Sequence, residues 1–289
     1  MRLSLSITNY SWPEGPAGLA TALSNIVQTA DRSDLDTVWV ADHLIQADPT
    51  SIPDSEMLEA YTTLGFLAAQ TRRVRLGTMV TGATFRPPSL LVKAVTTLDV
   101  LSGGRAWLGV GAGYHEDEAS AMDLPLPPIG ERFERLEEIL QLAVQMGRDD
   151  RSPFVGRHYR LGRPVNNPPP LTKPHPPILI GGMGERKTLR LVAQYADACN
   201  LFDIPDEGRT IRHKLDVLAR HCDAVGRPYQ EIEKTVSTRL APDESPAEFA
   251  ERCAALAAFG IEHAVVITDG PWSESAVRRL AAAGRQLLA

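Results

Sequence analysis

The chain has 289 residues, 43% of them hydrophobic, and a formal net charge of −6. This acidic balance lacks the basic stripe of a nucleic-acid-binding protein, and no apolar run approaches the roughly 18 residues that span a bilayer. The start of the chain lacks the apolar core of a signal peptide, and the three cysteines are scattered without metal-type or redox-type spacing. We therefore expect a cytoplasmic protein that binds neither nucleic acid nor a membrane.

Apolar periodicity predicts alternating strands and helices from the first residues. Arg2–Thr8 reads as a strand and Leu19–Ala30 as a helix with one apolar face. Thr37–Ala41 is predicted to be the second strand, and Glu56–Thr71 the second helix. This alternation is the pattern of an α/β protein.

The stretch from Val74 to Tyr114 contains a complete strand–helix–strand unit. Val74–Val80 and Ala106–Val110 are short apolar runs typical of buried parallel strands. Pro87 and Pro88 open the helix between them, and a Ser-Gly-Gly sequence ends it. Both strands finish in small or turn-forming residues, and such carboxyl ends are where a parallel α/β sheet binds its ligand.

The second half of the chain continues the alternation after one long interruption. Gly130–Met146 is a strongly amphipathic helix, and residues 147–177 form an irregular connection rich in Pro, Gly and Arg, with a hairpin around Phe154–Leu161. Such a connection is either a lid within the domain or a surface excursion. The further strands are expected at 178–180, 198–202, 233–238 and 263–267, each followed by a helix, at 188–196, 209–225, 246–259 and 274–288.

Eight strand–helix units in this length favour a single-domain (β/α)8 TIM barrel over residues 1–289 rather than an open doubly wound sheet. The long connection then lies between the fourth helix and the fifth strand. Asp42 and His43 follow the second strand, at the end where a barrel places proton-transfer groups. A histidine that only satisfies a neighbouring backbone group is the alternative.

Three further motifs contain residues that could bind a cofactor, a metal ion or a phosphate. Gly109–Gly113 lacks the helix opening of a dinucleotide fingerprint, and small residues there fit the approach of a flat ring. His115–Glu118 lacks a converging partner set, so no metal site is expected and a charged helix start explains it. Gly181–Thr188 combines three glycines, a helix start and two cations, which favours a phosphate site over a simple turn.

The segments WVADH, LGTMVTGATFRPPSLLVKAVTTLDVLSGGRAWLGVGAGYHEDE, GERFERLEEILQ and PPILIGGMGERKTLRLVAQYADACNLF resemble the bacterial luciferase-like monooxygenase superfamily, in particular its probable F420-dependent oxidoreductase branch. The resemblance covers nearly the whole chain. It implies a barrel that holds a deazaflavin or flavin across the strand ends, and a homodimer packed through early helices.

The resemblance also implies roles for individual residues. His43, preceded by Asp42, matches the histidine that faces the deazaflavin ring, and Met79–Val80 falls where relatives carry a non-prolyl cis peptide. The ring contacts are expected at Thr81, Gly111, Ala112 and Gly113, and the phosphate contacts at Gly181, Gly182, Met183, Gly184, Arg186 and Lys187. Arg160 and Arg163 are candidates for the cofactor's polyanionic tail.

Tyr114 stands where the sugar-phosphate dehydrogenases of the family carry an acidic residue, so oxidation of a sugar phosphate is disfavoured. Tyr114, Glu116 or His43 alone is expected to move the proton, and Trp12, Tyr114 and Phe202 are expected to contact the substrate. The predicted function is an F420-dependent oxidoreductase acting on a small organic molecule. An FMN-dependent monooxygenase using O2 and a non-catalytic cofactor-binding protein are the alternatives.

Overall fold

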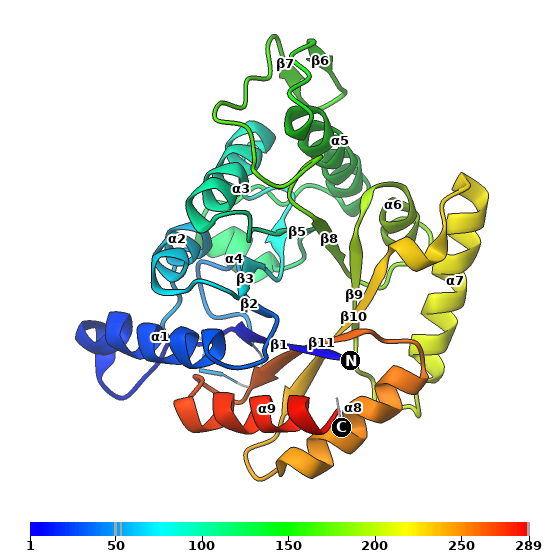
Figure 1. The fold of residues 1–289 in the computed structure, drawn as a ribbon. Coiled ribbons are helices and arrows are strands. Elements are labelled where there is room, and N and C mark those ends of the chain that lie inside the picture. Colours follow the sequence, from blue (N-terminus) through cyan, green and yellow to red (C-terminus); the bar gives the residue numbers. More distant parts are fainter. Residues whose placement is uncertain (49–50, 53, 288–289) are drawn as a thin grey trace.

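The computed structural model describes residues 1–48, 51–52 and 54–287. Parallel strands alternate with helices and form one barrel with the helices outside it (Figure 1). The barrel strands are β1 (Arg2–Ile7), β2 (Thr37–Val40), β3 (Arg75–Thr78), β4 (Thr81–Gly82), β5 (Leu108–Gly111), β8 (Ile178–Gly181), β9 (Ala198–Phe202), β10 (Glu233–Leu240) and β11 (His263–Thr268). The helices are α1 (Gly15–Asp31), α2 (Ala60–Gln70), α3 (Pro88–Ser102), α4 (Glu116–Ala121), α5 (Ile129–Gly147), α6 (Thr188–Tyr195), α7 (Arg209–Val225), α8 (Pro246–Ala258) and α9 (Glu274–Gln286), with a 3-10 turn, η1 (Tyr229–Glu231).

The strand order closes the barrel. The strands follow one another as β3-β2-β1-β11-β10-β9-β8-β5-β4, and every pair in this sheet is parallel. β3 and β4 are successive pieces of one strand, separated by a cis peptide bond between Met79 and Val80. A parallel bridge between Leu76 and Ala106 joins β3 to the segment entering β5. The predicted (β/α)8 barrel and the predicted cis bond are both confirmed.

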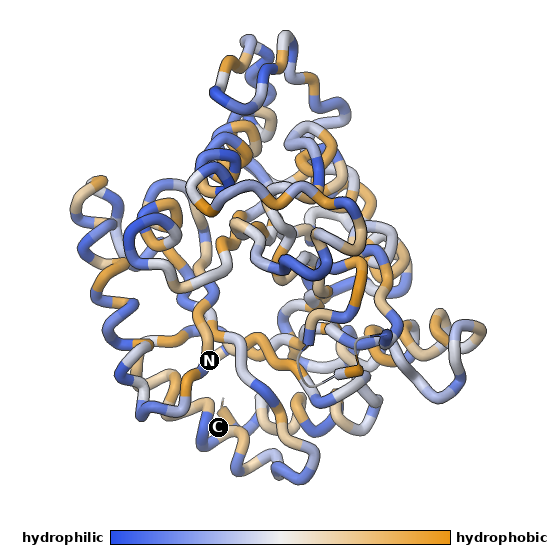
Figure 2. The backbone as a smooth tube through the Cα atoms, turned by 180° about the vertical axis from the view of Figure 1, so that it is seen from behind, coloured by the Kyte–Doolittle hydropathy of each residue, from blue (hydrophilic) through white to orange (hydrophobic). Residues whose placement is uncertain are grey.

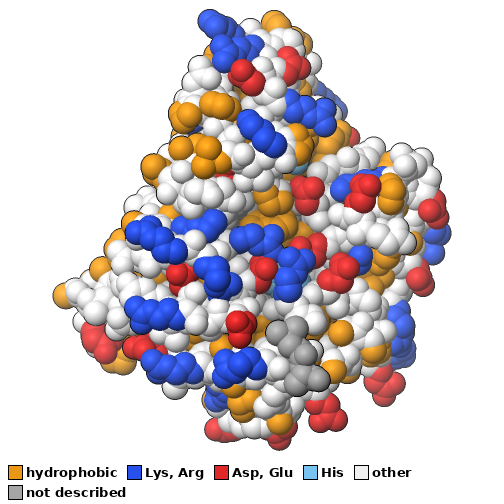
Figure 3. Space-filling view, in the orientation of Figure 1, with side chains coloured by type: hydrophobic (Ala, Val, Ile, Leu, Met, Phe, Trp, Pro, Cys, Tyr) orange, Lys and Arg blue, Asp and Glu red, His pale blue; other side chains and the backbone are white. Residues whose placement is uncertain are grey.

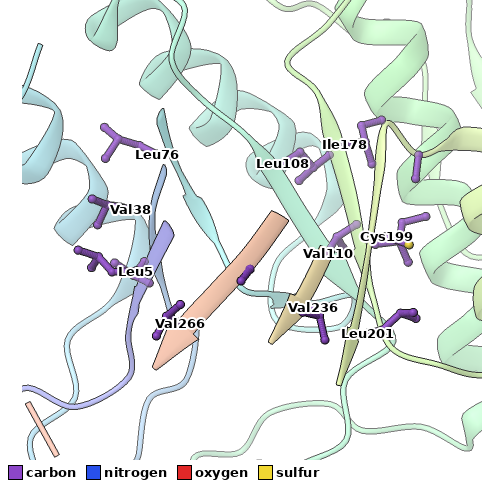
Figure 4. Packing of buried hydrophobic residues seen from close by; sticks show 14 of the residues in the cluster. Leu5, Val38, Leu76, Leu108, Val110, Ile178, Cys199, Leu201, Val236 and Val266 are labelled. Atoms are coloured by element: carbon purple, nitrogen blue, oxygen red, sulfur yellow. The ribbon is translucent and has the colours of Figure 1, made fainter. Parts of the chain in front are cut away.

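Side chains alternate between the two faces of each strand, as expected where both faces are buried. Figure 4 shows the outward set, including Leu5, Val38 and Leu76, pointing away from the barrel toward the helices. The inward set includes Trp39 and Trp107, whose ring centroids lie 5.7 Å apart. A Cβ at Gly77 would lie 2.7 Å from the Cβ of Trp107 and 2.8 Å from Trp39, so only glycine lets both indoles fill the barrel interior.

The end of the barrel where the strands begin carries ion pairs. Arg2 contacts Asp36 and Glu233, and His263 Nδ1 lies 2.7 Å from Glu233. Figure 3 shows basic and acidic side chains mixed over this face. Along the outer helices hydrophilic and hydrophobic residues alternate (Figure 2), because one helix face packs on the barrel and the other meets solvent. Among the described residues, no helix has both the length and the apolar character to cross a bilayer.

The connection 147–177 contains the expected hairpin, formed by β6 (Phe154–Val155) and β7 (Arg160–Leu161). The buried carboxylate of Glu138 on α5 holds it, accepting backbone hydrogen bonds from Arg157 at 2.7 Å and from Tyr159 at 2.9 Å. At the other end of the connection, the Asp99 carboxylate accepts hydrogen bonds from Thr172. The connection is therefore fastened to α3 and α5.

The structure differs from several of the sequence-based boundaries, and α1 begins at Gly15 rather than at Leu19. The second helix begins at Ala60 rather than Glu56, because the Glu59 side chain caps it by accepting a hydrogen bond from Thr62 N at 2.6 Å. The apolar run Val74–Val80 is interrupted before Val80. The short helix α4 lies between β5 and α5, and the expected end of the last helix at Leu288 lies outside the described residues.

Candidate functional site

Two cavities open at the end of the barrel where the strands finish. The glycine-lined cavity, of about 580 Å³, includes Gly82, Gly111, Gly113, Gly181 and Gly182 in its wall. The arginine-lined cavity, of about 520 Å³, includes Arg239 and Arg252. The two share the wall residues His43, Met79, Tyr114, Phe202 and Ser237. A molecule in one cavity therefore meets a molecule in the other along this shared wall.

His43 is held by a buried glutamate. Its Nδ1 lies 2.6 Å from Oε2 of Glu118, and the other carboxylate oxygen accepts a hydrogen bond from Leu44 N at 2.5 Å. Burial acts to raise the pKa of Glu118, but the hydrogen bonds from His43 and Leu44 outweigh it and hold that pKa below its ordinary value. The ionised Glu118 keeps a proton on Nδ1, so Nε2 of His43 is the ring nitrogen left for the cavities.

Asp42, the residue before His43, is buried and forms an ion pair with Arg86. Arg86 donates to both of its carboxylate oxygens, at 2.6 and 3.0 Å, and the Thr81 hydroxyl donates to it at 2.6 Å. Tyr61 adds a hydroxyl contact to Thr81 at 3.0 Å and lies under the Arg86 guanidinium. This network ties the Asp42 carboxylate to Arg86 and fixes the loop after β2.

Small residues around Val80 shape the glycine-lined cavity. A Cβ at Gly111 would lie 3.0 Å from Val80 Cγ2, and one at Gly181 would lie 3.1 Å from the same atom. The two glycines thus make room for the Val80 side chain as well as for a ligand. Ala112 and Gly113 continue this wall, and Asn200 closes it with an amide that donates to Ser237 at 2.8 Å.

The segment Gly181–Lys187 connects β8 to α6 beside the same cavity. Gly182 has a φ of +114°, a conformation that side-chain-bearing residues avoid. A Cβ at Gly184 would lie 2.8 Å from Thr188 Oγ1, so the backbone is packed tightly at the start of α6. Lys187 is exposed and its ammonium lies 5.4 Å from the Phe133 ring centroid, at the cavity wall. Arg186 is also exposed, and Met183 packs against the core while its sulfur accepts from Phe202 N.

The remaining predicted site residues divide into two groups. Tyr114 and Phe202 lie in the shared wall, and the Tyr114 ring contacts His43 edge-on, with centroids 5.7 Å apart. Glu116 is exposed on α4 and lines neither cavity. Trp12 also lines neither, because its indole N–H donates to Trp272 O at 2.8 Å and its ring packs on Tyr10. Arg160 and Arg163 lie on the long connection, and neither lines the two cavities.

Sequence reasoning missed Glu118, Arg132 and the two arginines of the second cavity. Glu118 had a readable signal, since it stands three residues after His115, the N-cap of α4, whose Nδ1 accepts from Glu118 N at 3.0 Å. The Glu118 side chain therefore points back toward the barrel, whereas the Glu116 side chain faces solvent. Arg132 donates to Gly113 O at 2.6 Å at the rim of the glycine-lined cavity, and its Nε is buried without a partner among the described residues.

The family model of the luciferase-like monooxygenases matches residues 1–287. An F420-dependent glucose-6-phosphate dehydrogenase of Kineococcus radiotolerans is 32% identical over 238 residues, which is 79% of this chain and 66%, just under two thirds, of that protein. A monooxygenase from Streptomyces bottropensis has the same fold, with a TM-score of 0.82, 18% identity and full coverage of both chains. An F420-dependent secondary alcohol dehydrogenase solved with an F420–acetone adduct gives a TM-score of 0.80 at 16% identity over 99% of each chain. The chain belongs to the luciferase-like monooxygenase family.

Proposed function

We propose that this protein is an F420-dependent oxidoreductase that exchanges a hydride between the deazaflavin and a small organic substrate. The observation that carries the proposal is the His43–Glu118 pair, placed in the wall that two cavities share. One cavity suits a planar cofactor and the other a second reactant. The sequence relative named as an F420-dependent dehydrogenase supports the choice of cofactor.

The glycine-lined cavity fits a tricyclic ring with a phosphate-bearing tail. Its wall combines Phe85, Phe133 and Val80 with glycine backbone, and it contains one carboxylate, Asp42, which is neutralised by Arg86. Flat aromatic ligands pack on such apolar walls, while a few polar groups fix their orientation. Gly181–Gly184 with Lys187 and Arg186 would hold the first phosphate near the start of α6.

When bound, F420 would supply the hydride chemistry, and the protein would supply position and proton handling. With Nδ1 protonated by its contact with Glu118, His43 accepts at Nε2 the hydroxyl proton of an alcohol that is being oxidised. In the reverse direction the imidazolium returns that proton to a carbonyl oxygen. Tyr114 and Phe202 line the shared wall, where they would contact both reactants.

Titration of the purified protein with F420 and with FMN, at low and high salt, tests the cofactor. We expect F420 to bind more tightly than FMN, with an affinity that weakens as salt screens the exposed Lys187 and Arg186. Tight FMN binding without F420 binding would replace the proposal with the FMN-dependent monooxygenase.

His43→Asn tests the chemistry. Turnover should fall by about 10²–10⁴-fold, because the general acid–base group is lost, while F420 affinity changes little. Equal turnover in variant and parent would make the histidine structural, and F420 binding without turnover of any substrate would favour a non-catalytic cofactor-binding protein.

We also propose a homodimer. Leu90 and Leu101 on α3 are exposed, at 55% and 73%, and apolar side chains at such positions favour burial between subunits. Sedimentation equilibrium with Leu101→Lys tests the dimer, and an unchanged mass would exclude this surface.

A further inference from the structure

The arginine-lined cavity offers neither of its guanidinium groups to a ligand. Arg239 is shared between Asp48, at 3.2 Å, and Asp269, at 2.6 Å. Arg252 is likewise shared between Asp203, at 3.1 Å, and Glu244, at 3.0 Å. Of these four carboxylates, those of Asp48 and Asp203 line the cavity, and those of Asp269 and Glu244 hold the guanidinium groups from outside its lining.

All three nitrogens of Arg252 and both Nη atoms of Arg239 also donate hydrogen bonds within the protein. Arg239 donates from Nη1 to Thr268 O at 2.9 Å, and Arg252 donates to the Thr238 hydroxyl at 2.6 Å and to Arg239 O at 2.7 Å. Recognition of a phosphate by arginine needs free N–H groups arranged as a fork, with net positive charge around them. A phosphoryl group in this cavity would meet the carboxylates of Asp48 and Asp203, and among the described lining residues both cations are already paired.

A neutral donor does point to a ligand. Ser6, on β1, is 1% exposed and lines the arginine-lined cavity, and its hydroxyl has no hydrogen-bond partner among the described residues. Buried hydroxyl groups nearly always find a partner, and a ligand oxygen in this cavity can supply one. Ser237 stands in the shared wall and accepts from Asn200, which leaves its own hydrogen for a second oxygen. Met57, Met79 and Ile267 supply apolar surface.

We infer that the arginine-lined cavity takes an uncharged hydroxy or carbonyl compound, without a phosphate, whose oxygen hydrogen-bonds to Ser6. This inference rests on the proposed function, because it names the reactant that meets F420 across the shared wall. In the oxidation, the carbinol C–H bond breaks and its electron pair leaves as hydride to oxidised F420. The hydroxyl proton goes to Nε2 of His43, so the alcohol becomes a carbonyl compound and the cofactor is reduced.

The first test is isothermal titration calorimetry of the F420-loaded protein, with inorganic phosphate and with glucose 6-phosphate as the titrants. We expect no saturation up to about 10 mM in the parent protein. The double variant Asp203→Asn with Glu244→Gln releases Arg252 and should tighten phosphate binding by about tenfold or more. The single variant Asp203→Asn serves the same purpose with less disturbance of the fold.

Saturable binding of either anion below about 10 mM by the parent would overturn the inference, and so would folded variants without a gain in affinity. Failure to bind F420 would instead overturn the proposed function. In that case the same titration on the cofactor-free protein still decides whether the cavity accepts phosphate.

The second test compares reduction of F420 by matched substrates: glucose with glucose 6-phosphate, and glycerol with glycerol 3-phosphate, alongside 2-propanol and cyclohexanol. Faster turnover of a phosphorylated member of either pair would contradict the inference. For the fastest neutral alcohol, Ser6→Ala should raise KM by about three- to tenfold and leave the F420 dissociation constant unchanged. Ser4→Ala is the matched control, since Ser4 lies two residues earlier on the same face of β1 and its hydroxyl already donates to Ala264 O at 3.3 Å. An equal KM effect in the two variants would remove Ser6 from substrate binding.

Discussion

Replacing Glu118 by glutamine should disable His43 while leaving the cofactor site intact. The backbone N–H of Leu44, 2.5 Å from Glu118 Oε1, needs an acceptor, so the glutamine carbonyl will face Leu44. The amide NH₂ then faces Nδ1 of His43, 2.6 Å from the replaced oxygen, and that nitrogen must become the acceptor. The proton moves to Nε2, which is the wrong tautomer for accepting a proton from an alcohol.

The size of this effect follows from the bond that is lost. A charge-assisted hydrogen bond to a buried carboxylate contributes about 1.5–3 kcal/mol, which is about 10–10²-fold in rate. An inverted tautomer in a comparable acid–histidine pair costs about 10⁴-fold. We therefore expect kcat to fall by about 10²–10⁴-fold and the F420 dissociation constant to change by less than about threefold.

The assay is steady-state F420 reduction across pH, with F420 affinity measured separately by fluorescence. Glu116→Gln is the matched control, because this glutamate lies two residues earlier on α4 and is exposed. A positioning role also changes the shape of the pH–rate profile, whereas a purely structural role lowers activity at every pH alike. A fall in turnover of less than about threefold in Glu118→Gln would refute this reasoning, and so would an equal fall in Glu116→Gln.

The pH dependence of stability also tests the His43–Glu118 pair, and four further substitutions test the fold and the long connection. Because the folded-state pKa of Glu118 is lowered, its stabilisation is present above the ordinary glutamate pKa and is lost as pH falls through the folded value, so parent and Glu118→Gln should converge in unfolding free energy at acid pH. Asp42→Asn removes one carboxylate from the half-buried Arg86, which keeps Glu59 as a partner, and should cost about 1.5–3 kcal/mol in urea unfolding, whereas no measurable loss would deny the pair a structural role. Glu138→Gln should make residues 154–161 sensitive to limited proteolysis without lowering the melting temperature of the barrel, and unchanged cleavage would show that other contacts hold the hairpin. Gly109→Ala should prevent folding because its Cβ would lie 1.8 Å from Thr78 O, while Gly65→Ala on α2, with open space around it, should stabilise the protein by about 0.5–1 kcal/mol.

The barrel could be predicted from the sequence because each of its strands and helices is encoded by residues that lie close together along the chain. The outward residues of each strand, such as Val38 and Leu76, are followed within a few positions by turn residues and then by a helix with apolar spacing, so periodicity was sufficient. The capping box that opens α8, in which Ser245 and Glu248 hydrogen-bond reciprocally, is likewise encoded in four consecutive residues.

The chemistry of the site could not be read in the same way, because partners lie far apart along the chain. Asp42 meets Arg86 across 44 residues, and His43 meets Glu118 across 75. An aspartate next to a histidine looked like one functional pair, yet the structure gives each its own partner. Glu118 was passed over for Glu116 because the inward position is readable only once His115 is recognised as the N-cap of α4.

The fit of Val80 between Gly111 and Gly181 makes three positions interdependent in evolution and in design. A methyl group added at either glycine meets the valine, so each of the three is constrained by the other two. Among homologues, a larger residue at position 111 or 181 should accompany a smaller one at position 80. To admit a bulkier ring, the first substitution to make is Val80→Ala. The smaller side chain widens the glycine-lined cavity, and it also allows residues larger than glycine at positions 111 and 181.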